Sequence, residues 1–298
     1  MRVFLTGGTG YVGSAVLDAF VRAGHHVDAL VRHSEKAATA RAHGAHPVTG
    51  DLGDPSSYAD AAAAADGVIH AAIEYSARGP QLDATALDTV LGTQRENRFV
   101  IYTSGVWILG PTSAPADETA PLNPAEISAW RVAHEQRVLE ASASGVRTVV
   151  VRPGIVYGGS RGIVGDLFKD AANGLIRVIG NGDNHWPLVY DRDLGDLYLR
   201  LALNAKASGI YHANDEGDER VSDVVTAIAE HVNIRSSIRH VPIAEARQKM
   251  GPYADALTLD QIVRSPRARA LGWSPSLHSV AGSAPRLFEE WRRGREAA

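Results

Sequence analysis

Three glycines near the start of the chain, Gly7, Gly10 and Gly13, follow a short apolar segment with the spacing Gly-x-x-Gly-x-x-Gly. A strand that ends in such a turn and opens a helix presents backbone N–H groups and the positive helix end to a pyrophosphate. Gly7 would permit the tight turn, Gly10 the approach of the phosphates, and Gly13 close helix–strand packing. The loop predicts a bound dinucleotide, although an ordinary strand-to-helix turn remains the alternative.

The composition narrows the class of protein further. The chain has 298 residues, which favours one large domain or a domain with an added lobe, and 45% of them are hydrophobic. A net charge of −4 gives no reason to expect nucleic acid or a membrane surface as a partner. Cysteine is absent, so disulfides, thiolate nucleophiles and cysteine-ligated metals are excluded. Asp191 and Asp193 have no third ligand that could be assigned to them, so we expect no metal site. We find no basic–apolar leader and no apolar run of about 20 residues, so we expect a cytoplasmic protein.

Strand and helix patterns alternate through the first half of the chain. The predicted strands are Arg2–Leu5, His26–Val31, Pro47–Thr49, Gly67–Ala72, Phe99–Thr103 and Thr148–Val151. The predicted helices between them are Gly13–Ala23, Ser34–His43, Tyr58–Ala65, Asp83–Glu96 and Ile127–Ala143. Apolar strands separated by helices indicate an α/β fold with a doubly wound parallel sheet, which binds ligands beyond the carboxyl ends of its strands.

The organisation changes after the first half. We expect a dinucleotide-binding domain of the Rossmann type over residues 1–155, to which segments near residues 188–214 return. Residues 156–298 mix short strands and helices with a glycine-rich stretch, and they predict mainly a smaller lobe that binds the substrate.

Seven segments, in order along the chain, match a known family. They are Thr6–Gly13, Gly50–Leu52, His70–Ala72, Tyr102–Ser104, Arg152–Gly158, Leu188–Leu197 and Ala270–Pro275. On these segments the chain resembles the extended short-chain dehydrogenase/reductase proteins, the NAD-dependent epimerase/dehydratase group, over nearly its whole length. The resemblance implies a nicotinamide dinucleotide, a small-molecule substrate and, as in many members, a homodimer.

The resemblance also implies which residues hold the cofactor. Asp51 would accept a hydrogen bond from the adenine amino group, and Ala71 and Ala72 would be small where the backbone lies against adenosine and ribose. The full set of expected cofactor contacts is Gly7, Thr9, Gly10, Tyr11, Val12, Gly13, Arg32, Asp51, Leu52, Ala71, Ala72, Thr103, Trp130, His134, Pro153 and Ile155.

The end of the second predicted strand bears on the choice between NADP and NAD. An acidic residue at that place binds the ribose hydroxyls of NAD and repels a 2′-phosphate. The segment Ala29–Ser34 has no carboxylate, and Asp28 lies earlier in the strand. Arg32 offers a planar, permanently charged donor suited to phosphate. The segment favours NADP, with NAD and a plain surface arginine as alternatives.

The expected catalytic residues depart from the family pattern. Members use a serine together with a tyrosine and a lysine four residues apart on one helix. Ser104 stands at the serine position, but the tyrosine and lysine positions hold Trp130 and His134. Residues four apart share one helix face, so both side chains would face the cofactor. Tryptophan does not transfer protons in catalysis, whereas histidine exchanges one near neutral pH.

Three hypotheses for the chemistry remain open at this stage. His134 could act as the general acid or base while Ser104 orients the substrate. The proton could instead come from the second lobe, where Tyr157, His185 and Tyr190 are candidates. The protein could also bind the dinucleotide without using it as oxidant or reductant, as a redox sensor.

We predict an NAD(P)-dependent oxidoreductase or epimerase-like enzyme that acts on a small carbonyl or hydroxyl compound. Besides the sensor, the alternative is a redox-neutral lyase or isomerase in which the dinucleotide is structural. The expected substrate contacts come from Ser104, Tyr157, His185 and Trp186.

Overall fold

The computed structural model describes residues 1–93, 95–234 and 237–296, and the chain divides into two compact units. Unit 1 comprises Met1–Ser104, Trp130–Arg152 and Leu194–Tyr211. Unit 2 comprises Gly105–Ala129, Pro153–Asp193 and His212–Ala298. Each unit encloses a hydrophobic core of its own.

The central sheet has seven strands in the order β11-β6-β5-β4-β1-β2-β3. The strands are β1 (Arg2–Thr6), β2 (His26–Val31), β3 (His46–Thr49), β4 (Gly67–His70), β5 (Phe99–Thr103), β6 (Arg147–Pro153) and β11 (Gly209–Ala213). The helices connecting them are α1 (Tyr11–Arg22), α2 (Ser34–Ala42), α3 (Ala59–Ala64), α4 (Gly79–Thr93), α5 (Arg131–Glu140) and α7 (Asp191–Leu203). The pairs β1–β2, β1–β4, β2–β3, β4–β5 and β5–β6 are parallel, which confirms the predicted doubly wound α/β fold.

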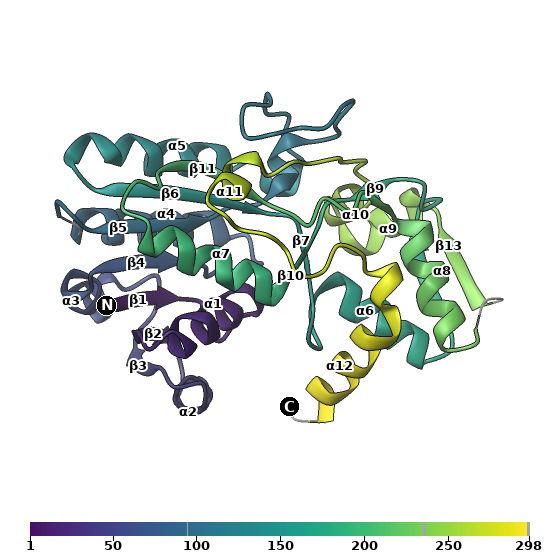
Figure 1. Cartoon of the computed structure of the whole chain (residues 1–298), viewed down its shortest axis with the longest axis horizontal. Coiled ribbons are helices and arrows are strands. Elements are labelled where there is room, and N and C mark those ends of the chain that lie inside the picture. Colours follow the sequence, from purple (N-terminus) through teal and green to yellow (C-terminus); the bar gives the residue numbers. More distant parts are fainter. Residues whose placement is uncertain (94, 235–236, 297–298) are drawn as a thin grey trace. The chain divides into compact units, whose positions relative to one another are not determined.

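Both faces of this sheet are buried, which explains why its strands are apolar throughout rather than alternating. On one face Phe4, Val68 and Val100 pack with apolar residues of α3, α4 and α5. On the opposite face Leu5 and Ala29 lie with Leu17 of α1 around Gly8. Figure 1 shows these helices flanking the sheet.

Strand register brings three polar residues to one level of the sheet. Thr6 of β1 pairs with His70 of β4, and His70 pairs with Tyr102 of β5. All three are buried, with relative exposures of 0%, 1% and 0%. Because neighbouring parallel strands end at the same edge, these side chains lie directly beneath the carboxyl edge where such sheets bind ligands.

Helix α5 is shorter than the predicted Ile127–Ala143, since the α-helix runs from Arg131 to Glu140 between short 3₁₀ turns. A buried ion pair ties it to β6. Both nitrogens Nε and Nη2 of Arg152 donate to the Glu135 carboxylate, the shortest contact being 2.6 Å, and each side chain is 3% exposed. Because the guanidinium and the carboxylate are planar and form two parallel contacts, the pair fixes the orientation of α5 as well as its distance from β6.

Unit 2 is built from short strands and a helical core. Its strands are β7 (Ile155–Tyr157), β8 (Ile176–Ile179), β9 (His185–Trp186), β10 (Leu188–Tyr190), β12 (Glu219–Arg220) and β13 (Ile238–Val241). Its helices are α6 (Gly162–Ala172), α8 (Val221–His231), α9 (Ile243–Met250), α10 (Tyr253–Leu257), α11 (Pro266–Ala270) and α12 (Ala284–Glu296). Helices α6, α8 and α12 pack together around one apolar cluster (Figure 1). Among the described residues, no helix is long and apolar enough to cross a bilayer.

The buried ion pair generates the first prediction. Glu135→Gln leaves the Arg152 charge buried without its counter-ion, and breaking a pair of this kind costs about 3–5 kcal/mol. We expect a matching fall in the free energy of unfolding, measured by urea denaturation. The control is Gln136→Ala, at the next residue along the chain and on the exposed side of α5. It should change the free energy of unfolding by less than about 0.5 kcal/mol. An equal effect of the two variants would contradict the assigned role of the pair.

Candidate functional site

The glycine loop has the geometry that a closely approaching ligand needs. Gly7 has a φ of 75°, and a Cβ there would lie 2.6 Å from the Ala72 nitrogen. A Cβ on Gly13 would collide with the Gly7 carbonyl. Gly10 ends the turn, donates to the Gly7 carbonyl at 2.8 Å and forms the N-cap of α1 without a side-chain hydrogen bond. The loop thus folds tightly between β1 and α1, and side chains at Gly7 or Gly13 would force it apart.

Further predicted nucleotide contacts of unit 1 lie in this loop, at the start of α1, or after β3 and β4. Ala71 and Ala72 follow β4 and lie against Gly7. Thr9 lies in the turn, and Tyr11 and Val12 begin α1. Asp51 is exposed and accepts from the Gly53 N–H at 2.8 Å, which closes a local turn. Leu52 is half-buried beside Asp51.

Arg32 lies just beyond β2, with a side chain 59% exposed and Nη1 3.3 Å from Oε2 of Glu74. Sequence reasoning missed Glu74, because it follows β4 rather than β2. Exposed ion pairs of this kind contribute little to stability, so the contact leaves the guanidinium able to take another partner. The end of β2 therefore carries a basic group, Arg32, with an acidic group from the segment after β4, Glu74, beside it.

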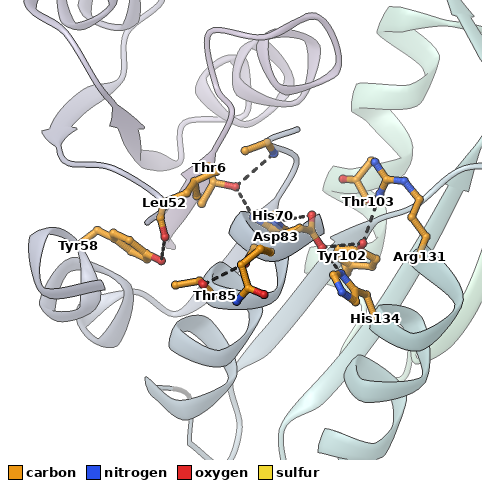
Figure 2. Close-up of polar contacts among 12 residues, drawn as sticks. Thr6, Leu52, Tyr58, His70, Asp83, Thr85, Tyr102, Thr103, Arg131 and His134 are labelled. Atoms are coloured by element: carbon orange, nitrogen blue, oxygen red, sulfur yellow. Dashed lines mark hydrogen bonds and ion pairs between the residues drawn. The ribbon is translucent and has the colours of Figure 1, made fainter. Parts of the chain in front are cut away.

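A buried carboxylate on α4, Asp83, organises the polar groups of unit 1 (Figure 2). Oδ1 accepts from Nε2 of His70 at 3.1 Å. Oδ2 accepts from Nδ1 of His134 at 2.6 Å and from the Tyr102 hydroxyl at 3.0 Å. These contacts join α4, α5, β4 and β5 through one 4%-exposed side chain.

Burial alone would raise the pKa of Asp83, but the hydrogen bonds from His134 and His70 outweigh it and hold the pKa below its ordinary value. Asp83 is therefore ionised at neutral pH and can only accept. Burial raises the pKa of Tyr102, which keeps this phenol protonated and able to donate to Asp83.

The ionised carboxylate determines the proton positions on both histidines. Since Asp83 can only accept, His134 must carry a proton on Nδ1 and His70 one on Nε2. Nδ1 of His70 then pairs with the Thr6 hydroxyl at 2.6 Å, which also accepts from the Ala72 N–H. The network runs from the backbone beside the glycine loop to His134. Because Nδ1 of His134 is engaged, Nε2 is the ring nitrogen left for chemistry.

The start of α5 is fixed by Arg131. Its Nη1 donates to the Thr103 carbonyl at 2.8 Å and to the Tyr102 hydroxyl at 3.3 Å. Its guanidinium lies 4.5 Å from the centroid of the Trp130 ring, and that ring meets His134 edge-on at a centroid distance of 5.0 Å. The two residues predicted at the tyrosine and lysine positions are thus in contact, although Trp130 precedes the helix rather than lying within it.

Ser104 follows β5 directly, next to the carbonyl that Arg131 binds. Its side chain is 8% exposed, and its hydroxyl is a buried polar atom for which the described residues provide no hydrogen-bond partner. Leaving a hydroxyl buried and unpaired costs free energy, so such groups merit a functional explanation. Thr103 instead uses its hydroxyl to bond Tyr198 at 2.7 Å.

The predicted site residues of unit 2 are mostly engaged within that unit. Pro153 and Ile155 are buried at the end of β6 and in β7. The buried Tyr157 hydroxyl donates to Asp215 at 3.1 Å, and the Trp186 indole donates to the Leu257 carbonyl at 3.0 Å. His185 pairs with Asp260 through Nδ1 at 2.8 Å.

Tyr190, also in unit 2, donates to Glu290 at 3.0 Å, and burial raises the pKa of Tyr190 to about 12. Burial likewise raises the pKa of Tyr157. Both phenols are therefore weak proton donors in this environment. These two tyrosines therefore support proton transfer from the second lobe less well than the Asp83 network supports proton transfer from His134.

Sequence reasoning missed Asp83, His70, Tyr102 and Arg131 as functional residues. One available signal was the position of Asp83 on α4, where it shares the buried stripe with Gly79, Ala86, Leu87 and Val90. A carboxylate on an apolar helix face needs buried partners. Their identity depends on strand register and on the contact between α4 and α5, which no local pattern contains.

Comparison with known proteins decides the family. Residues 3–213 match the model of the NAD dependent epimerase/dehydratase family. The chain belongs to this family. It is 32% identical over 293 residues to an uncharacterized protein of Schizosaccharomyces pombe, covering 94% of this chain and 96% of that protein.

Two further comparisons, one with a curated protein and one with a solved structure, are informative. The 4-hydroxy-2-methyl-3-oxo-4-farnesyl-3,4-dihydroquinoline-1-oxide ketoreductase of Stigmatella aurantiaca is 28% identical, with 83% of this chain and 78% of that protein covered. The fold is similar to that of UDP-glucose 4-epimerase of Thermus thermophilus in complex with NAD, with a TM-score of 0.80, 20% identity and coverage of 98% and 99%.

Asp215 of unit 2 generates a prediction about pH. Burial raises its pKa to about 7, although hydrogen bonds from Gly217 and Tyr157 act in the opposite direction. In the unfolded chain it titrates near pH 4. The folded unit therefore keeps the proton that the unfolded chain loses, so this carboxyl's contribution to stability is fully present below about pH 4 and is lost as the pH rises to about 7.

In the Asp215→Asn variant this side chain cannot ionise. Its free energy of unfolding should therefore fall less between pH 4.5 and 7.5 than that of the native protein. Urea denaturation at the two pH values measures this. Asp166→Asn, at an exposed site in the same unit, should leave the pH dependence unchanged. If the Asp215→Asn protein loses as much stability over this interval as the native protein, the raised pKa is wrong.

Proposed function

We propose that the protein is an NAD(P)-dependent oxidoreductase that reduces a small carbonyl compound or oxidises the corresponding alcohol. The observation that carries the proposal is the hydrogen bond from Nδ1 of His134 to the buried, ionised Asp83. It gives the chain an oriented acid–base group on the helix where family members carry tyrosine and lysine. A redox sensor without turnover would have no need of such a group.

The residues present fit a nicotinamide dinucleotide. The glycine loop has no room for a side chain at Gly7 or Gly13, and it opens α1, a helix of 12 residues whose positive end suits a pyrophosphate. Asp51 would hold the adenine side, and Arg32 the ribose or its 2′-phosphate. When bound, the reduced nicotinamide supplies the hydride that adds to the carbonyl carbon.

Ser104 and His134 would complete the reduction. The Ser104 hydroxyl donates a hydrogen bond to the carbonyl oxygen, which satisfies the buried group and polarises the carbonyl. During the reduction a protonated His134 ring would give its Nε2 proton to that oxygen and end neutral. Oxidation of the alcohol is the reverse. Asp83 stays bonded to Nδ1 throughout, so the ring keeps its orientation.

The substrate class follows from the same groups. Trp130 lies edge-on to His134 and is half-buried, so an apolar surface adjoins the proton donor. Such a surface suits a carbonyl with a hydrophobic substituent. The ketoreductase relative acts, by its name, on a carbonyl of this general kind. We therefore favour an apolar ketone over a sugar nucleotide as substrate.

Replacing His134 tests the proton transfer. His134→Asn retains a side-chain amide that can donate to Asp83 but cannot supply a proton. We expect kcat to fall by roughly 10²–10⁴, the usual contribution of a general acid, while the Kd for the dinucleotide changes less than about threefold. The measurement follows nicotinamide absorbance over a panel of apolar ketones, and binding is measured by calorimetry.

The matched control is His43→Ala, an exposed histidine of unit 1 paired with Asp18 outside the network. It should leave both constants unchanged. Unchanged turnover in His134→Asn would remove the proton role. Tight dinucleotide binding with no turnover over the whole panel would favour the sensor, and product formation without any net absorbance change would favour a lyase or isomerase.

Arg32 tests the choice of cofactor. If it binds the 2′-phosphate, Arg32→Ala should weaken NADPH binding by about ten- to a hundredfold, the value of a charge-assisted hydrogen bond, and leave NADH binding unchanged. Arg41→Ala removes an exposed arginine from neighbouring α2 and serves as the control for general charge. Equal losses for NADPH and NADH would contradict the preference for NADP.

A further inference from the structure

Two histidines and an aspartate converge at the start of β2 and β3, at the opposite ends of the strands from the glycine loop. Nε2 of His26 and Nδ1 of His46 lie 3.0 Å and 3.2 Å from the same oxygen, Oδ1 of Asp28. All three ligand-type atoms lie within 4.8 Å of one another. Nothing in the proposed reaction uses this group of residues.

The carboxylate is held in a fixed orientation. Asp28 is fully buried, and its other oxygen, Oδ2, accepts from Nε of Arg2 at 2.5 Å. Oδ1 is thereby directed toward both imidazoles. In protein metal sites a ligating carboxylate is itself hydrogen-bonded through its second oxygen, and that contact orients it. The Arg2 side chain performs this task here, and the backbone N–H of Arg2 donates to the Asp66 carboxylate.

We propose that His26, Asp28 and His46 form a binding site for a divalent transition metal, Zn²⁺ in the first instance. Two imidazole nitrogens and one carboxylate oxygen are a donor set that zinc accepts, with water in a fourth, open position. A tetrahedral ion with bonds of about 2.0 Å requires ligand atoms about 3.3 Å apart, close to the separations from Asp28. The imidazoles are 56% and 63% exposed, so an ion can enter from solvent and the rings can adjust.

The sheet holds the ligands in place before an ion binds. Asp28 of β2 and His46 of β3 are register partners in the parallel pair, and His26 lies two residues before Asp28 on the same face of the sheet. Strand β3 is the terminal strand of the sheet and has four residues. A bound ion would tie this short edge strand to its neighbour, which gives the site a structural role.

The test uses untagged protein treated with EDTA and then dialysed, titrated with ZnCl₂ by calorimetry. We expect one equivalent to bind, and one equivalent of Co²⁺ to give the visible absorbance of a tetrahedral site. The double variant His26→Ala, His46→Ala should lose this equivalent or bind it at least tenfold more weakly. Both side chains are exposed, so the variant should fold normally, as judged by circular dichroism.

His43→Ala is the matched control, because it removes an exposed histidine that pairs with a different carboxylate, Asp18. It should bind zinc as the native protein does. Zinc should also raise the Tm of the native protein and of this control but not of the double variant. The proposal is overturned if the native protein binds no stoichiometric zinc, or if the double variant binds it with unchanged affinity. Neither result depends on enzymatic activity, so failure here leaves the proposed function untouched.

Discussion

The ionised carboxylate of Asp83 is the interaction on which the candidate active site depends. A buried charge is tolerated only when donors surround it, and His70, His134 and Tyr102 supply them from separate elements. In return the carboxylate fixes the proton on each imidazole and the direction of each ring. Removing the Asp83 carboxylate would leave several buried donors unpaired at once, so its hydrogen bonds depend on one another.

The surrounding structure holds the hydrogen-bond network of Asp83 in place. The parallel pairing of β1, β4 and β5 sets Thr6, His70 and Tyr102 at one level, and the Glu135–Arg152 ion pair anchors α5 to the sheet. Arg131 adds a second anchor at the first turn of the helix. A helix held at two points by planar, charged groups presents the next residues at a defined place, as catalytic geometry requires.

The sequence predicts Trp130 and His134 at the tyrosine and lysine positions of the family, and the structure shows what these two side chains contact. Their rings contact each other edge-on, and His134 also bonds the buried Asp83 of α4. The cofactor loop, in contrast, keeps its glycines for steric reasons that hold whatever reaction follows. The glycine loop and the acid–base group are thus separate properties, because the loop depends on backbone space and the acid–base group on side-chain chemistry.

The sequence by itself determined the alternation of strands and helices, the glycine turn and the family, because each is encoded in local periodicity or in short ordered segments. It also predicted site roles for Ser104, Trp130 and His134. Boundaries were less secure: α4 begins at Gly79, before the predicted Asp83. Only the tertiary structure decided that Asp83 lies between His70 and His134, since residues far apart in the chain meet there through strand register and helix packing. The histidine–aspartate cluster at the other end of the sheet arises in the same way, from a strand pairing that no spacing along the chain reveals.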